Sequence, residues 1–289
     1  MCQDGDSRER ASGVPTYMTD DKSARGLPAA ERRKFFRHRL YAALGYQGRI
    51  PLRLTEVDGY CRIEARDGSV FCVSPKRWRF YKKGLAGCLD YMDSFYQFTA
   101  LDPPPGPVLD VGAHTGEFAL LALNQGRAVY AVEPDPDALA CLRRNLVGRE
   151  TATIIDSLVW NAEEELTFGG GALNGTSSVF IDDDAEGSNG ALHRSATTLD
   201  RIAADHGIDT LAFLKVEAVG AEAEALAGGR DLLRRTARIA VSTGPKPYSK
   251  GMTTTDACEA LLRDAGFTVR TIDRRHIVTI GSRGKGGGL

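Results

Sequence analysis

The feature that most constrains this chain is an apolar segment that ends in a glycine-containing loop and leads directly into a helical pattern. The segment is Val108-Leu109-Asp110-Val111, the loop is Gly112-Ala113-His114-Thr115-Gly116, and Glu117 opens the helical pattern. A second apolar segment, residues 128–132, ends in Glu133-Pro134. A strand that turns through glycines into a helix, followed by a strand that ends in an acid, is typical of folds that bind a nucleoside-bearing cofactor.

The spacing of the glycines argues against a dinucleotide. A pyrophosphate needs a GxGxxG loop with no acid beside it, but this loop has only Gly112 and Gly116, and Asp110 precedes it. Asp110 suits a ligand with a sulfonium and an α-ammonium group, and Glu133 is placed to accept hydrogen bonds from both ribose hydroxyls. These residues predict S-adenosylmethionine as the cofactor. The alternative interpretation is an ordinary strand-to-helix turn followed by a chance terminal acid.

Composition excludes several other classes of protein. The 37 basic and 38 acidic residues nearly balance, so no overall field draws the chain to nucleic acid or to a membrane. No apolar run approaches the roughly 20 residues that span a bilayer, and the N-terminal residues lack the apolar stretch of a secretory signal. We therefore expect a cytoplasmic protein. The six cysteines form no C-x-x-C pair, and no His, Cys and carboxylate cluster has metal-ligand spacing, so we expect no metal.

The chain divides into four parts by composition and pattern. These are a flexible or disordered N-terminus (1–30), an accessory region (31–102), a cofactor domain (103–281) and a flexible tail (282–289). The accessory region carries a basic helical pattern (31–44), a β-hairpin pattern (60–73) and an aromatic helical pattern (78–98), and the proline-rich segment 103–107 marks the boundary. A two-residue hairpin loop at Asp67-Gly68 would place Cys61 and Cys72 on the same face, and we expect this hairpin to pack across the mouth of the cofactor domain.

Strand and helix patterns alternate along the cofactor domain, as a doubly wound, mostly parallel α/β sheet requires. The predicted strands are 108–111, 128–132, 153–158, 211–216, 238–242, 268–273 and 277–280, with the last two as an antiparallel pair. The predicted helices are 116–125, 136–147, 199–206, 221–235 and 254–265. Asp135 before Pro136 predicts the start of the second of these helices.

Several separated motifs resemble those of the FkbM family of S-adenosylmethionine-dependent methyltransferases, from about Lys76 onward. They are Asp110 to Glu117, Glu133-Pro134, Gly175-Thr176-Ser177-Ser178, Thr198-Leu199-Asp200, Leu214 to Glu222, Ser242-Thr243-Gly244-Pro245 and Gly266-Phe267. The resemblance implies a class I, Rossmann-like, seven-stranded sheet. Two positions depart from the family pattern: His114 stands where Asn is usual, and Val219 stands where a second acid is usual.

Site residues follow from these motifs. The predicted cofactor-binding residues are Asp110, Gly112, Ala113, His114, Gly116, Glu117, Glu133, Pro134, Asp156, Ser157 and Glu217. The predicted substrate-binding residues are Tyr81, Tyr91, Ser177 and Ser178. An alcohol nucleophile loses a proton on methylation, so we expect Glu217 to be the catalytic base, with His114 as second candidate. Lys215 either pairs with Glu217 or meets a substrate oxygen.

Each of these residues also has an ordinary structural interpretation. Lys215 and Glu217 can form an ion pair at a strand end, and His114 can cap a helix or face solvent. The two serines can belong to a plain turn, and the two tyrosines can pack in the core.

The family resemblance, more than any residue, implies O-methylation of a hydroxyl on a sugar, polyketide or other secondary metabolite. The expected partner is a small-molecule substrate, with a homo-oligomer left open. One alternative is a cofactor-binding or regulatory member that lacks catalysis, because Val219 replaces an acid. Another is an RNA methyltransferase, suggested by the basic segment 32–39. The absence of an N/D-P-P-Y/F motif after the fourth strand weighs against methylation of base amino groups.

Overall fold

The computed structural model describes residues 27, 29–57, 59–65, 68–75, 77–169, 178–179, 192–245, 253–273 and 276–284. Most of the two segments that the sequence predicts to be flexible, 1–30 and 282–289, lies outside these residues. The first described helix, α1, spans Ala29–Ala43, and the last strand, β13, spans Ile277–Ser282.

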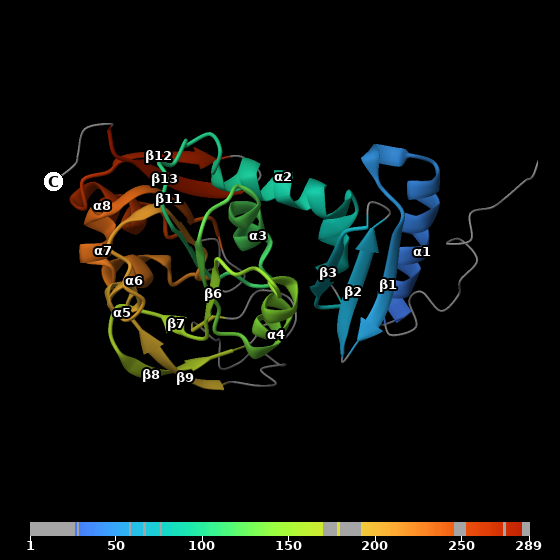
Figure 1. Ribbon diagram of the computed structural model, residues 1–289, viewed down its shortest axis with the longest axis horizontal. Coiled ribbons are helices and arrows are strands. Elements are labelled where there is room, and N and C mark those ends of the chain that lie inside the picture. Colours follow the sequence, from blue (N-terminus) through green and yellow to red (C-terminus); the bar gives the residue numbers. More distant parts are fainter. Residues whose placement is uncertain are drawn as a thin grey trace, which may run out of the picture.

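A seven-stranded sheet forms the centre of the larger part of the molecule, beside the smaller part that contains α1 (Figure 1). Its strands are β4 (Val108–Val111), β5 (Val129–Val132), β6 (Ala152–Ile155), β10 (Leu211–Val216), β11 (Thr236–Ser242), β12 (Thr268–Asp273) and β13. Their order is β12-β13-β11-β10-β4-β5-β6, with β13 antiparallel to both of its neighbours and the other pairings parallel. Every residue of β4 and β10 is buried, as expected for parallel strands with helices on both faces. The predicted fold class is confirmed.

Two groups of helices cover the two faces of this sheet. The helices are α2 (Gly84–Tyr96), α3 (Glu117–Asn124), α4 (Pro136–Asn145), α5 (Leu199–Asp205), α6 (Glu222–Ala227), α7 (Arg230–Arg234) and α8 (Thr255–Asp264). Phe213 of β10 belongs to the core that contains α2, α3 and α4, whereas Leu214 belongs to the core that contains α5 to α8. The Asp135 carboxylate accepts hydrogen bonds from the backbone of Asp137 and Ala138, which confirms it as the N-cap of α4.

The helix predicted over 221–235 is instead two helices. The helix is interrupted between α6 and α7 at Gly228-Gly229, where the backbone packs directly on a neighbouring segment. A Cβ atom at Gly228 would lie 2.2 Å from the backbone oxygen of Trp160. This close approach fixes the break.

The predicted strand 153–158 is also divided. β6 ends at Ile155, and β7 (Leu158–Val159) joins a separate sheet of order β7-β9-β8 with β8 (Glu164–Phe168) and β9 (Leu192–Thr197). The sequence analysis did not predict β8 and β9. Both strands are mostly exposed, so their apolar residues give no continuous pattern.

The N-terminal part forms a three-stranded antiparallel sheet beside α1. Its remaining elements are the 3-10 helix η2 (Tyr46–Gly48), β1 (Leu52–Val57), β2 (Tyr60–Ala65), β3 (Val70–Val73) and the 3-10 helix η3 (Arg77–Tyr81). The predicted hairpin is present, but Cys61 pairs with Val73 and Arg62 with Cys72, so the two cysteines lie on opposite faces. The expectation of a two-residue loop was wrong, because the backbone hydrogen bond that closes the hairpin joins Ala65 to Ser69.

This sheet packs against α4. The side chain of Asn145 hydrogen-bonds both backbone groups of Cys72, at 2.7 and 2.8 Å, and also donates to the backbone oxygen of Thr115 at 2.7 Å. The Sγ atoms of Cys72 and Cys141 lie 3.5 Å apart, and the Tyr60 hydroxyl donates to Asp137. Asn145 thus ties the accessory sheet to the glycine loop.

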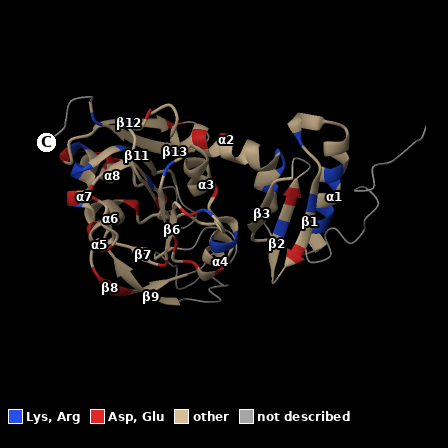
Figure 2. Ribbon diagram, viewed as in Figure 1, with Lys and Arg blue, Asp and Glu red and all other residues tan. Residues whose placement is uncertain are grey.

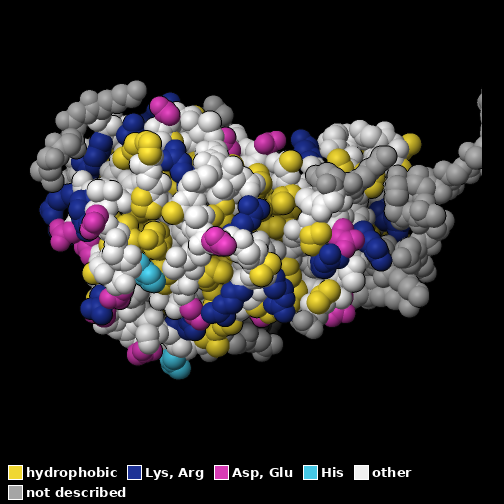
Figure 3. Space-filling model, in the orientation of Figure 1, with side chains coloured by type: hydrophobic (Ala, Val, Ile, Leu, Met, Phe, Trp, Pro, Cys, Tyr) yellow, Lys and Arg dark blue, Asp and Glu magenta, His cyan; other side chains and the backbone are white. Residues whose placement is uncertain are grey.

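The surface carries charges of both signs. Lys and Arg residues mark α1, and acidic and basic residues are interspersed over the cofactor domain (Figure 2). The space-filling view shows the same mixture on one face, with apolar side chains between the charges (Figure 3). None of the described helices has both the length and the apolar character needed to cross a membrane.

Candidate active site

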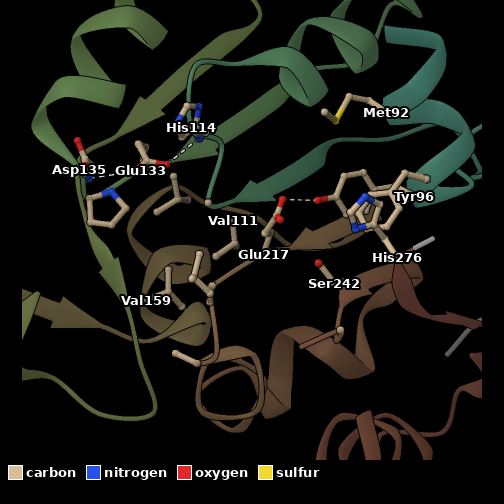
Figure 4. Close-up of a pocket in the computed structure, with 18 of the residues that line it drawn as sticks. Met92, Tyr96, Val111, His114, Glu133, Asp135, Val159, Glu217, Ser242 and His276 are labelled. Atoms are coloured by element: carbon tan, nitrogen blue, oxygen red, sulfur yellow. Dashed lines mark hydrogen bonds between the residues drawn. The ribbon is translucent and has the colours of Figure 1, made fainter. Parts of the chain in front are cut away.

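A cavity of about 600 Å³ opens at the carboxyl ends of the parallel strands, which is where doubly wound sheets bind their ligands. The cofactor domain contributes Val111, Gly112, His114, Val132, Glu133, Pro134, Asp135, Ser157, Glu217 and Val219, among others. The accessory region contributes Arg77, Phe80, Tyr91, Met92, Phe95 and Tyr96, and the last two strands contribute Asp273, His276 and Ile277. Glu133 and His114 lie at one end, Tyr96 and His276 at the other, and Glu217 between them (Figure 4).

The glycine loop fixes the Glu133 carboxylate at the end of β5. Gly112 has a φ of 71°, and a Cβ there would lie 2.0 Å from the backbone oxygen of Glu217, so only glycine fits. The His114 backbone donates a 2.7 Å hydrogen bond to Oε2 of Glu133, and the Asp135 backbone donates to Oε1 at 2.9 Å. Burial raises the pKa of Glu133 to about 7, although these two hydrogen bonds oppose the shift. The carboxylate is positioned at the cavity, as the sequence predicted for a ribose-binding acid.

Asp110 and Lys215 lie beneath the loop instead of in the cavity. Lys215 Nζ is 3.0 Å from Oδ1 of Asp110 and donates to the backbone oxygens of Val111 and Gly112, at 3.2 and 2.7 Å. Both charged side chains are buried and neither lines the cavity. The sequence predicted that Asp110 contacts the cofactor and that Lys215 pairs with Glu217 or meets a substrate oxygen. In the structure Lys215 pairs chiefly with Asp110 and lies 3.9 Å from Glu217 Oε2, so this ion pair holds the loop from below.

Glu217 follows β10 and presents its carboxylate to the cavity. Oε2 of Glu217 accepts a 2.5 Å hydrogen bond from the hydroxyl of Tyr96, and Lys215 Nζ lies 3.9 Å from the same oxygen. Burial, followed by the charge of Glu217, raises the pKa of Tyr96 well above its ordinary value, so the hydroxyl keeps its proton and remains a donor. The sequence analysis assigned no role to Tyr96, because its ring belongs to an aromatic stripe that is mostly core.

Glu117 and Tyr81 are also outside the cavity. Glu117 opens α3, is buried, and accepts hydrogen bonds from Arg77 Nε and from the Tyr81 hydroxyl, both at 2.9 Å. Burial alone would raise the pKa of Glu117, but Arg77 and then His114 lower it to about 2. Glu117, predicted to contact the cofactor, and Tyr81, predicted to contact the substrate, do not line the cavity in this structure. Glu117 holds Arg77, which does line it, and Tyr81 holds Glu117.

Other predicted residues divide between the cavity and its surroundings. Pro134 and Ser157 line the cavity, as predicted, whereas Asp156 points away and pairs with Arg194 and Arg143. Ala113 and Gly116 lie in the loop but do not line the cavity, and Ser178 is buried, with its hydroxyl donating to the backbone oxygen of Val219 at 2.9 Å. Ser177 lies outside the described residues.

His114 has a left-handed backbone conformation and lines the cavity. Its φ is 51°, and its ring faces the cavity while Nδ1 lies 3.2 Å from Oγ1 of Thr115. Burial lowers the pKa of His114 to about 4, with a further contribution from Arg77. The imidazole is therefore neutral at pH 7 and is a weaker base than an ordinary histidine.

An aromatic wall closes the end of the cavity opposite Glu133. The rings of Tyr91 and Phe95 lie parallel with centroids 6.0 Å apart, and His276 meets both edge-on, at 6.4 and 5.6 Å. Tyr91 was predicted to face a substrate. Phe95 lies one helical turn from Tyr91, a spacing visible in the sequence, whereas the contact with His276 depends on how the last two strands fold back.

Val219 adopts a strained backbone conformation at the cavity. Its φ is 46°, which is unusual for a β-branched residue. The Glu222 carboxylate accepts hydrogen bonds from the backbone of Ala218 and Gly220 on either side, and Ser178 donates to the Val219 oxygen. Within the described part of the chain, no group of three His, Cys or acidic residues comes together as a metal site.

The strand order and the acid at the end of β5 define the fold of class I methyltransferases. Residues 110–269 match the family model described as the FkbM methyltransferase domain. The chain belongs to the FkbM family of S-adenosylmethionine-dependent methyltransferases, as its motifs predicted. No curated protein sequence matches the chain.

Solved methyltransferase structures are similar to this chain only at low sequence identity. Precorrin-6y C5,15-methyltransferase from Geobacter metallireducens is 13% identical, with 68% of this chain and 87% of that chain covered and a TM-score of 0.38. Fibrillarin from Aeropyrum pernix, solved with S-adenosyl-L-methionine, is 13% identical over 80% and 99% of the two chains, with a TM-score of 0.40. Magnesium protoporphyrin IX methyltransferase from Synechocystis is 15% identical over 68% and 78%, with a TM-score of 0.38. Similarity at this level identifies no substrate.

Proposed function

We propose that this protein transfers a methyl group from S-adenosylmethionine to a hydroxyl of a small molecule such as a sugar, a polyketide or another secondary metabolite. The observation that carries the proposal is the Glu217 carboxylate, which Tyr96 holds in the cavity between the Glu133 end and the aromatic wall. The choice of oxygen as acceptor follows the family resemblance. A cytoplasmic location, expected from composition, remains a prediction.

The cavity fits the cofactor that the family implies. Each oxygen of Glu133 accepts one backbone hydrogen bond and retains a second acceptor site for a ribose hydroxyl. Four carboxylates, those of Glu133, Asp135, Glu217 and Asp273, line the cavity and suit a ligand with cationic groups. When bound, S-adenosylmethionine would supply a methyl group whose bond to sulfur breaks as the bond to the acceptor oxygen forms, with S-adenosylhomocysteine as the leaving group.

The protein's own residues then have two tasks. The first is to hold the acceptor hydroxyl in line with the methyl group, and positioning of this kind can supply about 7 to 11 kcal/mol of the barrier. The second is to remove the proton of the acceptor hydroxyl, and Glu217 is the carboxylate positioned to accept it. General-base catalysis of this kind raises the rate about 10²- to 10⁴-fold. Tyr96 orients the Glu217 carboxylate by donating a hydrogen bond to its Oε2 atom.

The aromatic wall supports a ring-bearing or largely apolar acceptor. Phe80, Tyr91 and Phe95 present flat apolar surfaces, and His276 adds a polar edge. Sugar faces and polyketide rings both stack on such surfaces. The RNA alternative has no comparable support, because no residue of the basic helix α1 is among those that line the cavity.

The test is the substitution Glu217→Gln, assayed by release of S-adenosylhomocysteine with a panel of hydroxylated sugars and polyketides. We expect turnover to fall about 10²- to 10⁴-fold, while the dissociation constant for S-adenosylhomocysteine changes less than about threefold. Asp273→Asn is the matched control, because it removes another carboxylate of the cavity that no hydrogen bond joins to Tyr96. An unaffected rate in the Glu217 variant would exclude this residue as base.

One observation favours a second function. Val219 occupies, with a strained backbone, the position where the family usually has an acid. A protein that binds the cofactor without transferring its methyl group would show normal affinity for S-adenosylhomocysteine in calorimetry and no product with any acceptor of the panel. Product formation with a single acceptor excludes this second function.

A further inference from the structure

The described lining of the cavity combines several acidic residues with one arginine. Of the described residues that line it, four are carboxylates and only Arg77 is a permanent cation. Arg77 comes from η3, ahead of the region that the family model covers. The accessory region thus places a positive charge in an otherwise acidic site.

Arg77 is held rigidly through one edge of its guanidinium group. Nε donates to Oε1 of Glu117 at 2.9 Å, and the Tyr81 hydroxyl donates to the same oxygen. The guanidinium carbon lies 4.6 Å from the centre of the Phe80 ring, and the side chain is 15% exposed. Within the described part of the chain, no group accepts a hydrogen bond from either terminal Nη nitrogen. A partly buried guanidinium whose two terminal nitrogens are fixed and unused is arranged to bind a carboxylate.

Arg77 also lies close to the loop over which the cofactor must run. Its charge acts on His114 in the loop and interacts with Glu217. Glu133 marks the ribose end, so a ligand that extends from Glu133 across His114 toward Glu217 brings its amino-acid part toward Arg77. The methyl donor carries two cationic groups and one carboxylate. The acidic residues suit the cations, and Arg77 is the only arginine or lysine among the described lining residues that can pair with the anion.

We propose that Arg77 binds the carboxylate of the amino-acid part of S-adenosylmethionine. This inference rests on the proposed function. It gives the accessory region a direct part in cofactor recognition, since η3 supplies Arg77 while the glycine loop and α3 supply the groups around it. The Glu117 carboxylate, opening α3, and the Tyr81 hydroxyl serve as positioning groups for the guanidinium.

The experiment compares S-adenosylmethionine with its decarboxylated analogue, which lacks only the carboxylate. Calorimetry on the full-length protein gives the ratio of the two dissociation constants. In the unsubstituted protein we expect S-adenosylmethionine to bind about 10- to 100-fold more tightly, the range for one charge-assisted contact. In Arg77→Met this preference should disappear, because only the carboxylate-bearing ligand loses affinity. The control Arg79→Met changes an exposed arginine of the same 3-10 helix and should keep the preference.

Three results separate this inference from its alternatives. If Arg77→Met keeps the preference, or weakens both ligands equally, Arg77 does not bind the carboxylate. If the unsubstituted protein binds neither ligand, the proposed function itself fails. Should Arg77→Met not fold, the variant Arg77→Met/Glu117→Gln removes both members of the buried pair, which leaves no uncompensated charge. A preference retained in that variant overturns the inference equally.

Discussion

The hydroxyl of Tyr96, the last residue of α2, donates a 2.5 Å hydrogen bond to the carboxylate of Glu217, the residue that follows β10. This bond joins the accessory region to the edge of the sheet where the parallel strands end. Its consequence is that the orientation of the proposed base depends on a residue outside the cofactor domain.

Loss of the Tyr96 hydroxyl should therefore slow the reaction without affecting cofactor binding. A hydrogen bond to a charged group contributes about 1.5 to 3 kcal/mol, so we expect Tyr96→Phe to reduce turnover about 10- to 100-fold. Affinity for S-adenosylhomocysteine should change less than about threefold. Tyr130→Phe, on β5 and absent from the cavity lining, is the control. An equal effect of both substitutions would show that the Tyr96 hydroxyl has no special role.

Asp110 and Lys215 should be much more costly to replace singly than together. Replacing Asp110 by Leu leaves the Lys215 ammonium buried without its counter-ion, which should cost about 3 to 5 kcal/mol. The double variant Asp110→Leu/Lys215→Met should recover much of that loss, because two apolar side chains replace both charges. Urea unfolding of the two single variants and the double variant measures the coupling. Strictly additive losses would contradict this account.

Glu133 should make the ligand-free protein less stable as the pH rises. Its pKa is about 7 in the folded protein, against an ordinary value of 4.5, so between pH 4.5 and 7 the folded state holds a proton that the unfolded state has lost. Stability should fall by up to about 1.4 kcal/mol per pH unit across this window. Glu133→Gln should remove that slope, because the amide does not titrate in this range.

The same substitution should weaken binding of S-adenosylhomocysteine at pH 8 about 10- to 100-fold, because the ribose loses a charged acceptor. Melting curves from pH 5 to 8, with and without the ligand, measure both effects. The control is Glu164→Gln, an exposed residue of β8. An unchanged pH slope in Glu133→Gln would refute the assignment of this group.

Val219 should store strain that glycine would release. A side chain in the left-handed region costs about 1 to 2 kcal/mol. Glycine avoids this cost but loses about 0.5 to 1 kcal/mol of stability, because its unfolded state has more conformational freedom. Val219→Gly should accordingly raise stability by about 1 kcal/mol, measured by urea unfolding. Ala218→Gly at the neighbouring position, whose φ is not positive, should lower it. A loss of stability in both variants would show that the Val219 conformation carries no strain.

Much of the fold was predictable because the central strands are buried on both faces. β4 and β10 have the predicted bounds, because mostly apolar runs mark such strands in the sequence. β8 and β9 could not be predicted, because neither strand buries enough of its length to leave a pattern. The hairpin register failed for a different reason: one extra loop residue moves each side chain of β3 to the other face.

The candidate site was predictable where a residue's position in its own element decides its exposure. Glu133 and Glu217 follow β5 and β10, and both line the cavity. The sequence did not show that Asp110 and Lys215 lie below the loop, because their ion pair depends on the register between two adjacent strands. Arg77 and Tyr96 were missed because their positions depend on how the accessory region docks on the sheet.

The aromatic wall and Arg77 precede residue 110, and His276 follows residue 269, so these groups lie outside the segment that the family model covers. Two enzymes with the same core sequence can consequently differ in which molecule they modify. Sorting members of this family by preferred acceptor will require comparing their flanking segments, where natural variation can retune selectivity while leaving the shared chemistry intact.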